Sequence, residues 1–145
     1  MKPIGKVYVD GASRGNPGPA GIGIVVSDSE GKILREHYEF IGSHYTNNQA
    51  EYMALIKALD LCSSMFPKGI LHVFSDSELL VKQLTGLYKV RSPNLKKLFR
   101  EVKRKEKMFS KVFYHHISRE NNIKADRLAS KAIDENINKQ AQTSQ

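Results

Sequence analysis

The 145-residue chain carries 23 Lys and Arg against 15 Asp and Glu, which gives a net charge of +8 and an isoelectric point near 9.6. Its 40% hydrophobic content and mean hydropathy of −0.44 are typical of one soluble globular domain, and the length leaves no room for two. No apolar run reaches the ~20 residues of a membrane span, and the N-terminus lacks the apolar core of a signal peptide. Cys62 is the single cysteine, which excludes an intrachain disulfide and predicts a cytoplasmic protein.

Basic residues gather in one part of the chain. Ten of the 23 Lys and Arg residues lie between Lys89 and Lys111, where Glu101 and Glu106 are the only acids. Such an excess favours binding of a polyanion through phosphate contacts and counterion release. A solvated, lysine-rich helix face would have the same composition, so charge indicates nucleic acid without establishing it.

The first third of the chain predicts an antiparallel meander of three strands. β-Branched and aromatic residues alternate over Ile4–Val9, and a glycine-rich loop follows at Gly11–Gly18. Gly21–Ser27 is rich in Ile and Val, and a turn signal separates it from a third strand at Ile33–Ile41. Asp10 stands where the first strand is expected to give way to the loop. Taken alone, it fits a turn residue as well as a functional carboxylate.

A long helix is predicted from Thr46 to about Met65. Apolar residues recur at helical spacing and should form its buried stripe: Ala54, Leu55, Ala58, Leu61 and Cys62. Glu51 lies four residues before Leu55 and therefore belongs to the same stripe. We expect its carboxylate to point towards the sheet.

The second half of the chain alternates strands and helices. The predicted elements are a strand at Ile70–Phe74, helices at Glu78–Leu84 and Pro93–Lys107, a strand at Lys111–His115, and a last helix at Ile123–Ile137. A nearly continuous apolar strand after a helix suits the centre of a mixed sheet. The prediction is an α/β fold over residues 1–137, with a five-stranded mixed sheet flanked by helices and a polar, flexible tail at 138–145.

Two more acids occupy positions that a purely structural role explains poorly. Asp76 follows the fourth strand, and Asp126 lies three residues before Ala129 on the apolar side of the last helix. A helix N-cap is the plain structural interpretation of Asp76, since aspartate is favoured there.

Four carboxylates that converge on one crevice would repel one another, and divalent cations are their natural compensation. The acids are Asp10, Glu51, Asp76 and Asp126. Hard oxygen ligands favour Mg²⁺ or Mn²⁺, and two such ions can activate water for phosphodiester cleavage. The single cysteine and the absence of paired helical histidines argue against zinc.

At this point the sequence resembles the type 1 ribonuclease H family. The matching motifs are Tyr8-Val-Asp-Gly-Ala12 with Gly15-Asn-Pro-Gly18, Thr46-Asn-Asn-Gln-Ala-Glu-Tyr52, Ser75-Asp-Ser77, and His116 followed by Asn121-Asn122 and Ala125-Asp126. Each motif alone is weak, but four in order from Val7 to about Ile133 are highly specific.

The resemblance implies a ribonuclease H-like fold and an endonuclease that cuts the RNA strand of RNA–DNA hybrids, leaving 3′-hydroxyl and 5′-phosphate ends. It implies that Asp10, Glu51, Asp76 and Asp126 hold two Mg²⁺ or Mn²⁺ ions. His116 would be a mobile loop histidine that assists proton transfer or product release.

The resemblance also implies substrate contacts. Ser13, Asn16 and Asn47 would face the minor groove of the hybrid, where 2′-hydroxyls distinguish RNA from DNA. Thr46 would bind a DNA phosphate, and Asn122 would help to position the last aspartate.

The sequence departs from well-known members of the family, which carry a basic protrusion with several tryptophans. This chain has no Trp, and Thr85–Pro93 is too short for such an insertion, so it resembles the compact archaeal-like and bacterial members. Glu78 stands where a neutral amide is common. We expect a monomer, and two alternatives remain: a related nuclease that also cuts double-stranded RNA, and a non-catalytic nucleic-acid-binding module.

Overall fold

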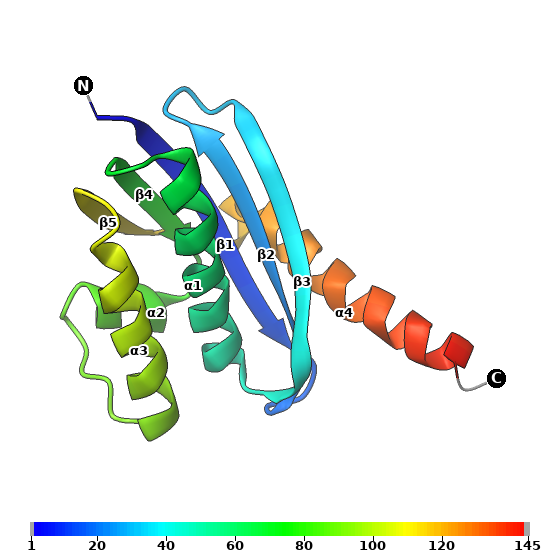
Figure 1. Ribbon diagram of the computed structural model, residues 1–145. Coiled ribbons are helices and arrows are strands. Elements are labelled where there is room, and N and C mark those ends of the chain that lie inside the picture. The colour runs from blue at the N-terminus through cyan, green and yellow to red at the C-terminus, as the bar shows by residue number, and fades with distance from the viewer. Residues whose placement is uncertain (1, 144–145) are drawn as a thin grey trace.

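Figure 1 shows the computed structural model, which describes residues 2–143. Five strands form one sheet in the order β3-β2-β1-β4-β5. Their bounds are β1 Ile4–Ser13, β2 Gly18–Asp28, β3 Ile33–Tyr45, β4 Ile70–Ser75 and β5 Lys111–His116. The first three strands pair antiparallel, while β4 pairs parallel with both β1 and β5. The predicted α/β fold with a five-stranded mixed sheet is confirmed.

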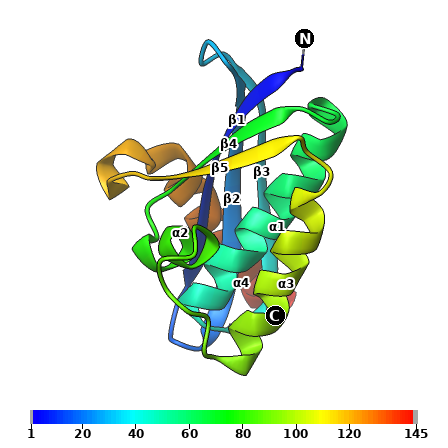
Figure 2. The same cartoon turned by 90° about the vertical axis from the view of Figure 1, so that its left-hand side faces the viewer.

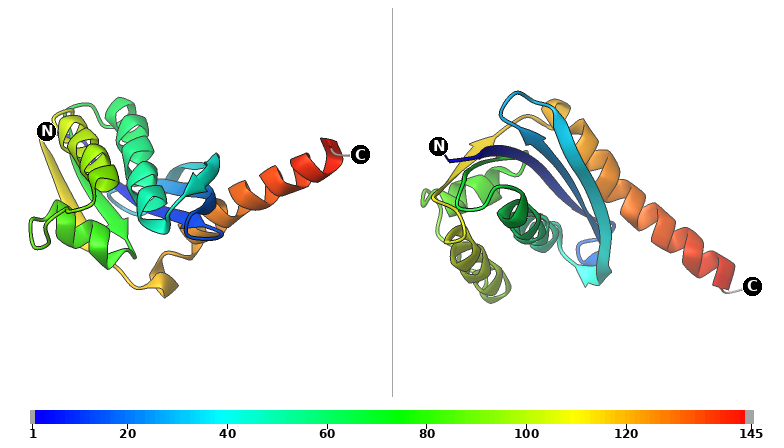
Figure 3. Two further views of the ribbon diagram at one scale, coloured as in Figure 1. Left: turned by 90° about the horizontal axis from the view of Figure 1, so that it is seen from below. Right: turned by 45° about the horizontal axis from the view of Figure 1, so that its top comes forward.

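Helices cover the two faces of the sheet unequally. The helices are α1 Asn47–Met65, α2 Glu78–Leu84, α3 Pro93–Glu106 and α4 Ile123–Thr143, with a 3₁₀ turn η1 at Arg119–Asn121. Figure 2 places α1 and α3 on one side of the strands and the start of α4 on the other. α4 packs against β1, β2 and β3, so within residues 2–143 the second face of the sheet is covered mainly over these three strands (Figure 3).

The core lies between α1, α3 and the sheet. Four residues of the predicted α1 stripe are fully buried and Leu61 is partly buried, as periodicity indicates: Ala54, Leu55, Ala58 and Cys62. They pack with Val7, Val9, Leu71 and Val73 from the two central strands. Burying a Val or Leu side chain contributes roughly 1.5–3 kcal/mol, so the contacts of Leu55 with these strand residues help to fix α1 over β1.

The other face brings α4 unusually close to β2. A Cβ on Gly23 would lie 2.0 Å from the carbonyl oxygen of Ala125, and one on Gly21 would lie 2.6 Å from that of Ala129. Only glycine permits this approach of a helix backbone to a strand. The close contact sets the start of α4, and hence Asp126, beside β1.

Several predicted boundaries are wrong, among them the start of β2, which is Gly18 and not Gly21, and the end of β3, which is Tyr45 and not Ile41. β1 continues to Ser13, because Asp10 pairs with Gly23 and Ala12 with Gly21 in the hairpin with β2. His116 is the last residue of β5, where it pairs with Ser75, so it does not lie in a loop. α4 extends through residues 138–143 instead of ending at Ile137, and its last turns project beyond the sheet (Figures 1 and 3).

The extended helix has a local cause, since Lys, Gln and Ala favour helix over coil. The predicted tail therefore begins in helix, and residues 144–145 lie outside the described part of the chain. The division into a domain at 1–137 and a tail stays a prediction. Within residues 2–143, no helix combines the length and apolarity needed to cross a bilayer.

Candidate active site

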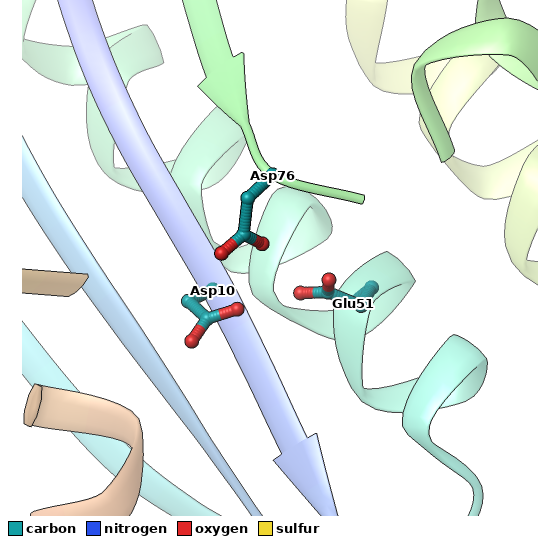
Figure 4. Close-up of side chains that lie close together, drawn as sticks. All are labelled: Asp10, Glu51 and Asp76. Carbon is teal, nitrogen blue, oxygen red and sulfur yellow. The ribbon is translucent and has the colours of Figure 1, made fainter. Parts of the chain in front are cut away.

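Parallel pairing of β1 and β4 sets Asp10 and Asp76 side by side. The last pair in this register joins Val9 to Ser75, so Asp10 and Asp76 are the next residues along the two strands. β4 ends there, while β1 continues. Asp10 therefore lies inside a strand, opposite a gap where β4 has stopped, and the side chain of Asp76 enters that gap (Figure 4).

Glu51 reaches the same gap from α1. Figure 4 shows its carboxylate directed at Asp10 and Asp76, and ligand oxygens of the three acids lie within 4.8 Å of one another. Asp10 and Glu51 are only 6% and 8% exposed. A pocket of about 380 Å³ opens over the cluster, and Asp126 and Arg119 line it as well.

Asp76 is not the N-cap of α2. Ser77 has that role, because its hydroxyl accepts a hydrogen bond from the Leu80 amide at 3.2 Å. Ser75 in turn accepts from the Ser77 amide at 3.0 Å. Its two serine neighbours satisfy the turn, so the carboxylate of Asp76 is left for the pocket.

Burial governs the ionisation of the cluster. It is the main cause that raises the pKa of Asp10 to about 10, and the neighbouring charges of Glu51 and Asp76 add to it. Burial raises the pKa of Glu51 to about 8, although the hydrogen bond from the Gly11 amide opposes the shift. Burial raises the pKa of Asp76 too, and the nearby Arg119 cation opposes it. The cluster therefore resists full ionisation unless a further cation arrives.

The donor set fits a hard divalent cation. Three carboxylates supply oxygen ligands only, and two of them are buried and lack an ion pair among the described residues. Divalent magnesium or manganese accepts such ligands and offsets their mutual repulsion. The predicted convergence of Asp10, Glu51 and Asp76 is thus present in the structure.

The fourth acid borders the group without joining it. Asp126 lines the pocket and contributes to raising the pKa values of Asp10 and Asp76, but it is not one of the three that lie within 4.8 Å. Its backbone amide donates to the Asn122 carbonyl at 3.1 Å, and Asn122 Nδ2 donates to the Val9 carbonyl at 2.9 Å. Asn122 therefore ties the start of α4 to β1, immediately beside Asp10.

Comparisons with known proteins agree on one family. A family model described as "Reverse transcriptase-like" matches residues 8–132. RNase H1 of Halobacterium salinarum superposes with a TM-score of 0.87 at 39% identity, covering 91% of this chain and 98% of that one. LC11-RNase H1, in a structure "in complex with RNA/DNA hybrid", gives 0.88 at 42% identity, covering 92% and 99%. The chain belongs to the type 1 ribonuclease H family.

The curated relatives are longer than this chain. "Ribonuclease HI" of Halobacterium salinarum is 42% identical over 130 residues, which are 88% of this chain and 63% of the relative. A bifunctional protein of Mycobacterium tuberculosis is 40% identical over 129 residues, which are 88% of this chain and 35% of the relative. The chain thus spans less than two thirds of the length of these relatives.

The predicted substrate residues meet at one end of α1. The Ser13 amide donates to Asn47 Oδ1 at 2.8 Å, and the Asn47 amide donates to Asn16 Oδ1 at 3.0 Å. Thr46 caps α1, since its hydroxyl accepts from the Gln49 amide at 3.1 Å. Neither Asn16 Nδ2 nor Asn47 Nδ2 has a protein partner among the described residues. Two amide donors are thus fixed by their oxygens and free on the exposed side.

His116 stands apart from the acidic pocket. It is exposed at the end of β5 and is not among the residues that line the pocket. Its charge contributes to lowering the pKa of Glu78, which Lys82 mainly lowers through a hydrogen bond at 2.5 Å. The structure thus places His116 near the start of α2.

Sequence reasoning missed several residues at these sites. Arg119 enters the acidic pocket from η1, far along the chain from the first three acids, and nothing in its neighbourhood signals this. Ser92 and Asn94, at the start of α3, line a pocket of about 230 Å³ together with Asn16 and Thr46. Ser92 caps α3, since its hydroxyl accepts from the Leu95 amide at 3.5 Å, and nothing local in the sequence signals its meeting with the start of α1.

Proposed function

We propose that this chain hydrolyses the RNA strand of RNA–DNA hybrids in a metal-dependent reaction that leaves 3′-hydroxyl and 5′-phosphate ends. The observation that carries the proposal is the convergence of Asp10, Glu51 and Asp76: the first two are buried, and ligand oxygens of all three lie within 4.8 Å of one another. A module that only bound nucleic acid would gain nothing from acids that face phosphates. The hybrid seen bound to LC11-RNase H1, 42% identical, supports the same substrate.

In this proposal Asp10, Glu51, Asp76 and Asp126 hold two divalent ions, Mg²⁺ or Mn²⁺. When bound, the ions supply Lewis acidity for water activation and stabilise charge on the leaving oxygen. Asp10, whose pKa is raised by burial and by the charges of both Glu51 and Asp76, would contact both ions. Asp126, beyond the group of three, would complete the second site. Arg119 balances part of the negative charge and keeps Asp76 closer to its ionised form.

The substrate would lie across the N-terminal ends of α1 and α3. Asn16 and Asn47 offer Nδ2 donors to the minor groove. The hydroxyl of Ser13 donates to the Tyr45 carbonyl at 2.6 Å and so holds the end of β1, where the loop that carries Asn16 begins, against the end of β3. The pocket shared by Thr46, Asn16 and Ser92 would take a phosphate of the DNA strand, since helix N-termini favour anions.

A second basic surface would replace the missing protrusion. Tyr88 and Phe99 line a pocket of about 410 Å³ with Lys89, Lys96 and Arg100. Lys82 Nζ lies 5.0 Å from the centre of the Tyr88 ring. Phosphates of the DNA strand would contact these cations.

His116 would act on the substrate side of the reaction, either transferring a proton or assisting product release. Its exposed place at the end of β5 supports a role outside metal binding. His116→Ala should slow turnover and leave metal affinity intact, as measured by titration calorimetry. Loss of metal binding as complete as in Asp10→Asn would exclude this role.

The experiment that tests the function compares labelled RNA–DNA hybrid, double-stranded RNA and double-stranded DNA, with Mg²⁺, Mn²⁺ or EDTA. Cleavage of the hybrid RNA strand, lost in EDTA and in Asp10→Asn, is the expected result. Equal cleavage of double-stranded RNA would establish the broader nuclease. Tight hybrid binding without cleavage under either metal would establish the non-catalytic module and overturn the proposal.

A further inference from the structure

A second cleft lies behind the acidic pocket, on the face of the sheet that carries the start of α4. It measures about 410 Å³ and shares no lining residue with the acidic pocket. One segment separates the two: Arg119 and Asp126 line the acidic pocket, while residues 120–125 line the cleft. We call it the η1–α4 cleft. Its size suits one small organic ligand.

An aromatic row ends at this cleft. Tyr8 stacks on Phe74 with ring centres 4.7 Å apart and planes at 15°, and Phe74 stacks on His115 at 4.8 Å and 19°. Tyr8 lines the cleft, and so does Val25, which pairs with Tyr8 from β2. Phe74 does not line the cleft. The cleft therefore opens on the side of Tyr8 turned away from Phe74. A planar ring placed there would extend the row by one member.

Exposed aliphatic side chains flank the opening. Ile33 is 40% exposed and Ile123 is 46% exposed, and both line the cleft. Large apolar side chains that are exposed around a cleft mark a binding surface more often than scattered ones do. They add apolar surface to the wall that Tyr8 and Val25 line.

The rim of the cleft is cationic. Lys6 and Lys124 line it, and neither forms an ion pair with any described residue. Glu120 is the single acid among the residues that line the cleft. The first residues of α4 are also in its wall, so the positive end of the helix dipole adds to the two lysines. The pKa of His72 is lowered by burial, by the charge of His115 and, third, by the charge of Lys6. The positive charge of Lys6 therefore acts across this face of the sheet. An anion would be attracted to this rim.

Polar groups in the wall could read the edge of a heterocycle. Ser27 and Asn121 both line the cleft. Asn122, which is 2% exposed, lines it too, and its Oδ1 is the one buried side-chain polar atom without a hydrogen-bond partner among the described residues. Leaving such an atom without a hydrogen-bond donor is unfavourable. Nucleobases carry amino groups that are donors of this kind.

We propose that the η1–α4 cleft binds one unpaired nucleotide, with its base stacked on Tyr8 and its phosphate at Lys6 and Lys124. The site uses none of the clustered acids and is separate from the proposed cleavage chemistry. The nucleotide is either a free mononucleotide or a nucleotide of a single strand. Residues 120–125 line the cleft and are directly followed by Asp126, which lines the acidic pocket. A bound nucleotide would therefore contact the segment that positions Asp126.

Nuclear magnetic resonance titration of the full chain in EDTA tests the site independently of cleavage. Adenosine 5′-monophosphate should shift the amide signals of Lys6, Tyr8 and residues 120–125. It should bind about tenfold more tightly than ribose 5-phosphate, as base stacking on an aromatic ring requires. A hexadeoxyadenylate strand that binds more tightly than the mononucleotide identifies the strand as the source, and equal or weaker binding identifies the free nucleotide.

Two exposed positions allow variants that do not disturb the core. Ile123→Glu and Lys124→Glu should each weaken adenosine 5′-monophosphate binding by about tenfold, by blocking the apolar wall and reversing the rim charge. Lys139→Glu, the same charge change further along α4, should bind as the parent does. The proposal is overturned by any of three results: no shifts at roughly 10 mM ligand, shifts confined to residues around Asp10 and Asp76, or equal binding of ribose 5-phosphate.

Discussion

The backbone amide of Gly11 donates a hydrogen bond of 2.5 Å to Oε1 of Glu51, which links β1 to α1 at the level where β4 has ended. The link needs a glycine: a Cβ at this position would lie 2.2 Å from the carbonyl oxygen of Ala50. The distance between strand and helix, and with it the placement of Glu51 beside Asp10, therefore depends on a missing side chain.

Gly11→Ala should push α1 away from β1 and withdraw Glu51 from the cluster. We expect a loss of about 1–3 kcal/mol in the free energy of unfolding, the usual cost of forcing extra atoms into a packed site. Hybrid cleavage at a fixed Mg²⁺ concentration should fall by more than tenfold. Gly86→Asn, at a left-handed position with nothing within 4 Å, is the control and should cost about 1 kcal/mol or less. Unchanged Mg²⁺ affinity in Gly11→Ala would show that Glu51 does not need this spacing.

The acidic cluster should make the metal-free protein less stable as the pH rises. Because the pKa values of Asp10 and Glu51 are raised to about 10 and about 8, the native state binds more protons than the unfolded chain above roughly pH 4. The free energy of unfolding then falls with pH, by up to about 1.4 kcal/mol per unit for each group. Thermal unfolding in EDTA should give a lower Tm at pH 8 than at pH 5.

Mg²⁺ should counter this loss, raising the Tm more at pH 8 than at pH 5. Asp10→Asn removes a buried carboxyl that must take up a proton on folding at pH 8, so the metal-free variant should be more stable than the parent at that pH and should respond less to Mg²⁺. Identical pH slopes for parent and variant in EDTA would contradict the assigned origin of the effect.

Arg119 should set the pH at which the acids become usable ligands. It opposes the burial that raises the pKa values of Glu51 and Asp76, so Arg119→Ala should move the acidic limb of the pH–rate profile to higher pH. We expect a loss in kcat/KM on the order of tenfold at pH 6 and a smaller loss at pH 8. Arg127→Ala, an exposed change on α4 outside the pocket, should leave the profile unmoved. A loss independent of pH would assign Arg119 to substrate binding instead.

Local patterns predicted the acids better than their surroundings. Helical spacing alone placed Glu51 on the buried stripe of α1, because the period of a helix fixes which residues share a face. Asp10 was expected at a strand end because Gly11 and the loop glycines read as turn residues. The strand continues instead, since Gly11 serves the approach of α1, which is a demand of tertiary packing. His116 joins β5 for a similar reason, through its pairing with Ser75.

The remaining parts of the site had no local signal in the sequence. Arg119 enters the pocket because η1 follows β5 at the edge of the cluster, which requires the order of strands to be known. The shared pocket of Thr46 and Ser92 depends on how α3 packs against α1. Contacts between distant segments are what a single sequence read by periodicity cannot supply.

The basic surface of α3 should contribute to hybrid binding by neutralising phosphates. Lys96 and Arg100 line the pocket beside Tyr88. Replacing both with alanine in an Asp10→Asn background should weaken hybrid binding and lower the slope of log affinity against log salt by about 1 for each phosphate that is no longer neutralised. Fluorescence anisotropy between about 50 and 200 mM salt measures the slope. Lys139→Ala is the control for removing a positive charge, and an equal change in its slope would place the phosphates elsewhere.

Asn122 should be the residue on which the position of Asp126 depends most. Its Nδ2 donates to the buried Val9 carbonyl at 2.9 Å, and its own carbonyl accepts from the Asp126 amide at 3.1 Å. Asn122→Ala leaves the Val9 carbonyl unpaired, so we expect a loss of about 1–3 kcal/mol in urea unfolding. Because the start of α4, which carries Asp126, is then no longer hydrogen-bonded to β1 through Asn122, kcat should fall by more than tenfold while KM changes little. Asn121→Ala removes only the exposed 3.0 Å hydrogen bond to Ser118 Oγ. It should lower the free energy of unfolding and the logarithm of kcat by less than half as much as Asn122→Ala does. If Asn122→Ala raised KM and left kcat intact, Asn122 would serve the substrate and not the aspartate.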